Sequence, residues 1–325
     1  MVLEPNVPGL QCGTPPKKAG ANITSGQRNV FFGDYAGFGG TLTGSCNIVG
    51  GYAAGYVLGG GTSNILLGHV SGFGLTSGGC NIALGKSAGQ NITTGDGNIA
   101  IGKFSAGKTN NKTGNTNILI GQYTGSCLSS GSRNIALGSY ALQKCTTSGS
   151  YNIAIGEKAG RCVSGSSNIA IGCIAMRSLG GGSGADNIAL GNGTMSCLGS
   201  GAENIAIGKN TMRCISSGDK NIGLGHLALG ACSTLTGDEN VAIGKYTSQV
   251  ITSGSRNITI GTVAGQCITT GGFNVFMGNA AGRNTTTGTR NIAIGCAVCL
   301  PTPGGDHQMA IGAGTTMWIT GDNSF

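Results

Sequence analysis

Charged and aromatic residues are scarce in this chain of 325 residues, at 9% and 5%. An ordinary globular domain has about 25% charged residues. Proline is rare as well, with six residues, and the absence of a Gly-X-Y period excludes collagen. No apolar run approaches the roughly 20 residues that span a membrane. The N-terminus also lacks the basic start and apolar core of a signal peptide. We therefore expect no membrane insertion.

Glycine is abundant instead, with 65 residues. Each glycine costs roughly 1 kcal/mol against alanine inside a helix, so a helical enzyme fold is disfavoured. Aliphatic residues recur all along the chain, which argues against disorder. The net charge is +8, but the 19 Lys and Arg residues are scattered rather than gathered in a stripe. We expect no nucleic-acid partner, and the composition predicts a repeat protein.

The repeat begins with Asn-Ile-Ala-Ile-Gly or a close variant, and ten of the sixteen intervals between copies are 17 residues. The leading asparagines are Asn29, Asn47, Asn64, Asn81, Asn98, Asn117, Asn134, Asn152, Asn168, Asn187, Asn204, Asn221, Asn240, Asn257, Asn274 and Asn291. Gln308 takes this position in a last copy. Glycine follows four residues after each leading residue and precedes it by three in all seventeen copies. Such columns indicate corners that need a positive φ, or places where backbones crowd.

Three apolar residues lie between each asparagine and its glycine, too few for a helix, and they predict a short β-strand. The first and third residues point to one face and the middle residue to the other. Both are apolar, so we expect both faces to be covered. We expect the isoleucine face to fill the coil. The small alanines of the other face should then meet a second and third copy of the chain.

Each copy is therefore expected to form one coil of an all-β, parallel β-solenoid, a left-handed β-roll or β-helix of about 17 coils. Stacked at about 4.8 Å, these coils would make a rod of roughly 80 Å. We expect residues 1–11 to be an N-terminal lead, 12–28 a degenerate first repeat and 29–325 the solenoid. The asparagines would form a structural ladder, since identical amides stacked one coil apart can bond one another.

The copy Asn152-Ile153-Ala154-Ile155-Gly156-Glu157-Lys158-Ala159-Gly160 resembles the repeats of phage and algal-virus tail-fibre proteins. It is also similar to the head repeats of trimeric autotransporter adhesins, which build a left-handed parallel β-roll. The resemblance covers more than nine-tenths of the chain. It implies a homotrimeric fibre segment that is used for attachment.

The thirteen cysteines lack the paired Cys-x-x-Cys spacing of a zinc site, and we expect no metal or other cofactor. Several lie ten or eleven residues after their asparagine, so stacked copies would bring them within disulfide range. Reduced thiols and disulfides between coils or chains both remain open. The disulfide candidates are Cys127, Cys145, Cys162, Cys197, Cys214 and Cys232. Asn-x-Thr triplets also mark possible glycosylation at Asn22, Asn91, Asn111 and Asn284.

Catalytic residues do not gather anywhere in the repeat. His69, His226 and His307 belong to different copies, and the eleven acidic residues are spread along the chain. No pair is placed for general acid–base chemistry, and we expect no enzyme.

The main functional hypothesis is a structural and adhesive fibre in a virion tail or an extracellular filament. Its partners would be its own copies, possibly also end to end, and a cell-surface glycan or receptor. Corner tyrosines are the contact candidates, although partial packing would also explain them: Tyr35, Tyr123, Tyr140 and Tyr246. The alternatives are a self-assembling extracellular filament subunit and an ice-binding solenoid. The ice-binding hypothesis depends on paired hydroxyl residues: Thr93-Thr94, Thr252-Ser253, Thr269-Thr270 and Thr286-Thr287.

Overall fold

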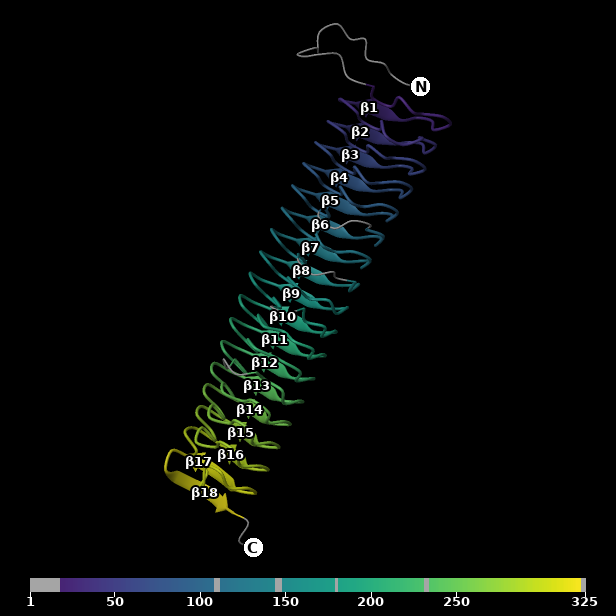
Figure 1. Ribbon diagram of the computed structural model, residues 1–325. Helices are drawn as coiled ribbons and strands as arrows, with labels where there is room; N and C mark the ends of the chain where they lie inside the picture. Colours follow the sequence, from purple (N-terminus) through teal and green to yellow (C-terminus); the bar gives the residue numbers. More distant parts are fainter. Residues whose placement is uncertain (1–17, 108–111, 144–147, 179–180, 231–233, 323–325) are drawn as a thin grey trace. The chain divides into compact units, whose positions relative to one another are not determined.

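The computed structural model describes residues 18–107, 112–143, 148–178, 181–230 and 234–322. The chain divides into two compact units, Met1–Arg161 and Cys162–Phe325. Each unit is a parallel β-solenoid that contributes one strand per coil to its sheet (Figure 1). The described residues contain only strands, turns and bends, and no helix among them could cross a membrane. The predicted parallel β-solenoid is confirmed. The expected lead over residues 1–11 lies outside the described residues.

The first unit stacks eight described strands in sequence order, each parallel to the next. Their bounds are β1 Val30–Phe32, β2 Ile48–Gly50, β3 Ile65–Leu67, β4 Ile82–Leu84, β5 Ile99–Ile101, β6 Ile118–Ile120, β7 Ile135–Leu137 and β8 Ile153–Ile155. Equivalent residues pair, as in Ile82 with Ile99, so the coils stay in register despite their different lengths. The described part of the degenerate repeat joins this stack, because Ile23 forms a parallel bridge with Leu42.

The second unit has the same organisation over β9 to β17 and then reverses direction. Its strands are β9 Ile169–Ile171, β10 Ile188–Leu190, β11 Ile205–Ile207, β12 Ile222–Leu224, β13 Val241–Ile243, β14 Ile258–Ile260, β15 Val275–Met277, β16 Ile292–Ile294, β17 Met309–Ala313 and β18 Thr316–Gly321. The strand β18 pairs antiparallel with β17. The side chain of Gln308 bonds both the N–H and the C=O of Thr302 in its own coil. The parallel stack therefore ends in a hairpin.

The middle residue of each strand points into the coil, and the predicted assignment of the two faces is wrong. Ala154, Ala206 and Ala293 are completely buried, whereas Ile171 and Ile207 remain about two-fifths exposed, at 38% and 40%. The interior is narrow. A Cβ atom on Gly282 would come within 2.5 Å of the Phe276 ring, so a large middle residue requires glycine opposite it. The middle strand position is usually small because the coil has little room beside the strand, and isoleucines form the strand's outer face.

The two glycine columns have different physical causes. Gly172, which ends strand β9, has a φ of +130°, a conformation that disfavours a side chain. Gly184 has no positive φ, but a Cβ atom there would lie 2.0 Å from the carbonyl oxygen of Gly201 in the next coil. Both predicted causes, positive φ and crowding, are therefore present.

Non-glycine residues adopt a left-handed backbone in further columns, two of which are mostly free of glycine. The residue before each ladder asparagine is one, for example Lys220 with a φ of 57° and Arg256 with 60°. The residue six positions after the asparagine is the other, and it includes Ile174 at 58° and Val263 at 52°. Left-handed backbone costs roughly 1–2 kcal/mol for an ordinary residue. The sequence offers no signal for this strain, since the residue types in these columns vary.

Replacing a branched residue in this column should stabilise the protein. Val263→Asn should raise the free energy of unfolding by about 1 kcal/mol, because asparagine tolerates left-handed geometry better than valine. Asn210 already occupies the same column with a φ of 54°. The reverse change, Asn210→Val, should therefore destabilise by a similar amount. Thermal unfolding measures both, and a lower melting temperature for Val263→Asn would contradict this interpretation.

Candidate functional site

The asparagine column forms a continuous hydrogen-bonded ladder inside each unit. The backbone N–H and Nδ2 of Asn204 donate to Oδ1 of Asn187, at 2.9 and 3.1 Å. Nδ2 of Asn204 also donates to the carbonyl oxygen of Gly218, at 2.8 Å. The bonds thus run to neighbouring coils rather than to the residue's own turn. Every leading asparagine is at most 7% exposed, so the column stabilises the wall and presents no side chains to a ligand.

Removing one amide should leave several buried polar groups without a partner. In Asn204→Ala, Asn221 loses its acceptor and the Gly218 carbonyl loses its donor. Each buried group left unsatisfied costs about 1–3 kcal/mol, so we expect a loss of at least about 3 kcal/mol. Asn192→Ala, at an exposed position, should stay within about 0.5 kcal/mol of the wild type. Equal unfolding free energies for the two variants would show that the ladder asparagine stabilises the protein no more than an exposed asparagine does.

The outer face of the strands is an exposed apolar stripe, two side chains wide, which we call the outer stripe. In the second unit it consists of Ile169, Ile171, Ile188, Leu190, Ile205, Ile207, Ile222, Leu224, Val241, Ile243, Ile258, Ile260, Val275, Met277, Ile292 and Ile294. The first unit has the equivalent stripe over β1 to β8, interrupted only at Gly50. Exposed fractions reach 43% at Val30 and 41% at Ile258. Contiguous exposed apolar surface of this kind marks an interaction site.

The corner tyrosines pack on aromatic neighbours one coil away. The ring of Tyr123 stacks between Phe104 and Tyr140, with 5.2 Å between centroids on either side. Tyr35 lies edge-on to Tyr52 at 5.9 Å, and Tyr246 lies 5.3 Å from His226 in a tilted arrangement. Neighbouring rings therefore cover part of each stacked face, and the outer edges of these half-exposed rings remain available to a partner.

The paired threonines do not form a flat hydroxyl array. The first hydroxyl of three of the four pairs bonds the next coil: Thr93 donates to the Lys112 carbonyl at 3.2 Å, and Thr252 to the Thr269 carbonyl at 3.1 Å. Thr269 donates in the same way to Thr286. Thr94, Ser253 and their equivalents are exposed and form only a single column.

The cysteine and glycosylation candidates fall into several environments. Cys127 and Cys197 are free thiols; Cys162 is buried and Cys214 half-exposed, while Cys145 and Cys232 lie outside the described residues. The side-chain amides of Asn22, Asn91 and Asn284 donate to the backbone of the next coil, as Asn91 does to Gly107 at 2.9 Å. A glycan would compete with these bonds. Asn111 lies outside the described residues.

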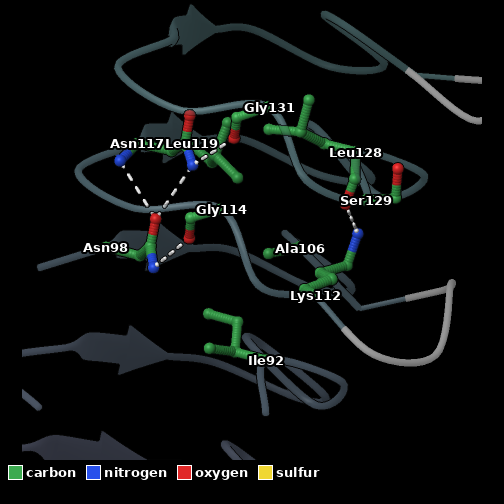
Figure 2. Close-up of a pocket in the computed structure, with 10 residues that line it drawn as sticks. All are labelled: Ile92, Asn98, Ala106, Lys112, Gly114, Asn117, Leu119, Leu128, Ser129 and Gly131. Carbon is green, nitrogen blue, oxygen red and sulfur yellow. Dashed lines mark hydrogen bonds between the residues drawn. The ribbon is translucent and has the colours of Figure 1, made fainter. Parts of the chain in front are cut away.

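A buried lysine is the feature that sequence reasoning missed. Lys112 is 4% exposed and bridges to Ile92, so it occupies a position where other coils place an aliphatic residue. Its Nζ donates to the carbonyl oxygens of Leu128, Ser126 and Gly125 in the next coil, at 2.6, 3.0 and 3.3 Å. Figure 2 shows the side chain between Ile92 and Leu128, at a small hollow in the core of the first unit. Burial lowers the pKa of Lys112 to about 7, and the Cys127 thiol opposes this shift.

The lowered pKa of Lys112 predicts a pH-dependent stability. Between pH 7 and 10.5 the unfolded chain holds a proton that the folded chain lacks, so stability rises with pH, by at most about 1.4 kcal/mol per unit. Relative to Lys112→Leu, the wild type should gain stability across this window. Melting temperatures at pH 7, 8, 9 and 10 measure the difference. In the control Lys103→Leu, at an exposed lysine, the difference in melting temperature from the wild type should not change with pH. If the difference between the wild type and Lys112→Leu also stayed constant with pH, it would contradict the lowered pKa of Lys112.

Comparison with known proteins leaves the fold as the main guide. No protein-family model, no curated protein and no solved structure matches the chain. Within the described part of the chain, no three His, Cys, Asp or Glu side chains gather into a group that could hold a metal ion. The class that the geometry defines is the parallel β-solenoid with an exposed apolar sheet face.

Proposed function

We propose that the chain is a rod-like segment of a structural and adhesive fibre, which assembles as a homotrimer and supports attachment to a cell surface. The observation that carries this proposal is the outer stripe, in which the first and third residues of each strand from β9 to β16 are apolar and partly exposed. The face that meets the other copies is therefore the isoleucine face and not the alanine face.

The size of the outer stripe supports self-association. Eight strands stacked at about 4.8 Å make a stripe about 38 Å long, and three residues make it about 10 Å wide. The projected area of each unit's stripe is then on the order of 400 Å², a size at which a contiguous apolar patch is often functional. Polar and charged columns border the stripe, as at the rim of a protein interface.

The resemblance to tail-fibre and trimeric adhesin repeats supports the left-handed, trimeric and non-catalytic form of the proposal. The fibre would belong to a virion tail or an extracellular filament. A cell-surface glycan or receptor would then contact the corners, where Tyr123 and Tyr140 expose their ring edges. No observation favours the ice-binding alternative, because one hydroxyl in three of the four pairs already bonds the next coil.

Sedimentation velocity at micromolar concentration tests the assembly. The wild type should sediment as a trimer, and the double variant Ile171→Glu/Ile207→Glu should shift toward the monomer, because burying an unpaired carboxylate is costly. Ser217→Glu, at an exposed corner, should leave the trimer intact, and far-UV circular dichroism should show the same fold in all three proteins.

A monomeric wild type would rule out the trimer. A double variant that stays trimeric would show that the outer stripe is not the interface.

A further inference from the structure

The outer stripe of the second unit cannot set the register of an assembly by itself. Nearly every strand presents Ile, Leu or Val at its two outer positions. A neighbouring copy that slides by one coil, about 4.8 Å, would cover almost the same apolar surface. Hydrophobic burial is proportional to area, so it hardly distinguishes these registers. Any preference must come from the residues beside the stripe.

Two exposed columns border the stripe and carry different charges. The leading edge is the residue before each ladder asparagine: Asp186, Glu203, Lys220, Glu239, Arg256, Phe273 and Arg290 for β10 to β16. The trailing edge is the residue after the glycine that ends each strand: Asn192, Lys209, His226, Lys245, Thr262, Asn279 and Cys296. Over β11 to β13 the trailing edge has no acidic residue. In the same coils the leading edge has two glutamates, and Asp219 and Asp238 precede its residues.

We propose that these edges recognise each other between copies of the chain, and so fix a parallel, in-register assembly. This inference rests on the proposed self-assembly. The interfaces of a cyclic trimer are heterologous, so the leading edge of one copy meets the trailing edge of the next. In register, Glu203 then faces Lys209 of the neighbouring copy, and Glu239 faces its Lys245. Opposite charges at an interface select orientation and register.

A slip of one coil in either direction loses this match. It places Lys220 against Lys245 of the neighbour in one direction, and against Lys209 in the other. The in-register arrangement instead places Lys220 opposite His226, so that no two lysines face each other. Among the three registers, only the matched one contains two opposite-charge pairs and no pair of lysines.

The contacts within the chain leave one of the two matched pairs, Glu203 with Lys209, without a competing salt bridge, whereas Glu239 already bonds Arg256 and Lys245 lies over the Tyr246 ring at 4.9 Å. Among the described residues, neither Glu203 nor Lys209 takes part in a salt bridge. The leading-edge arginines are already engaged: Arg256 bonds Glu239 at 2.8 Å, and Arg256 and Arg290 both lie over the Phe273 ring, at 5.3 and 5.4 Å. An antiparallel pairing of leading edges would have these arginines and Lys220 as its cations.

Charge reversal in the full-length chain, followed by sedimentation at low salt, tests the inference. The leading-edge variant Glu203→Lys/Glu239→Lys and the trailing-edge variant Lys209→Glu/Lys245→Glu should each raise the concentration of half-assembly about tenfold, because two pairs become repulsive. The quadruple variant reverses both edges and should return close to the wild type. Salt should reduce the differences.

The matched control is Arg213→Glu/Arg283→Glu, which changes the net charge as the trailing-edge variant does but at exposed corner positions away from both edges. It should assemble like the wild type. The inference is overturned if the trailing-edge variant assembles normally, or if the quadruple variant stays as weak as the single-edge variants. A larger loss in Arg256→Glu/Arg290→Glu would indicate antiparallel pairing and overturn it as well. A monomeric wild type would instead refute the proposed assembly.

Discussion

The hydrogen bond between stacked asparagine side chains is the interaction on which the rest of the structure depends. Each amide accepts from the coil that follows it and donates to the coils on both sides, and the amides are buried in a wall with few charges. Because buried amides without partners are costly, every coil must place its asparagine where it stacks on the asparagine of the coil before it. Loop lengths can then vary from coil to coil while the strands remain in register.

This constraint explains the narrow interior and the apolar exterior together. Beside the strand the interior has room for alanine, or for one large residue opposite a glycine, as at Phe276 and Gly282. Aliphatic residues outside the strands, such as Ile215 and Ile251, fill the rest of the core. The first and third residues of each strand point outward, and each coil adds two apolar side chains to a growing stripe. A single chain therefore cannot bury the outer stripe by itself. Covering the stripe with a partner would remove this apolar surface from water.

Much of the coil could be predicted from the sequence, because the asparagine and glycine columns are periodic and each has a direct physical meaning. The direction of the faces could not be predicted, since isoleucine and alanine are both apolar and the pattern does not give the width of the coil. The left-handed columns escaped notice because residues such as Val263 and Arg256 do not indicate positive φ. Lys112 could not be recognised as a core residue because its coil is longer than 17 residues. Its distance from the leading asparagine therefore differs from that of the equivalent aliphatic residues in other coils.

The central claim is that copies of the chain cover the isoleucine face. The most direct test is the cross-section of the assembled particle by electron cryo-microscopy. This account predicts three solenoids around one axis, with the ends of Ile171 and Ile207 directed toward that axis and the stacked tyrosines on the outside. A single solenoid with the isoleucines in solvent, or copies joined through another face, would contradict it.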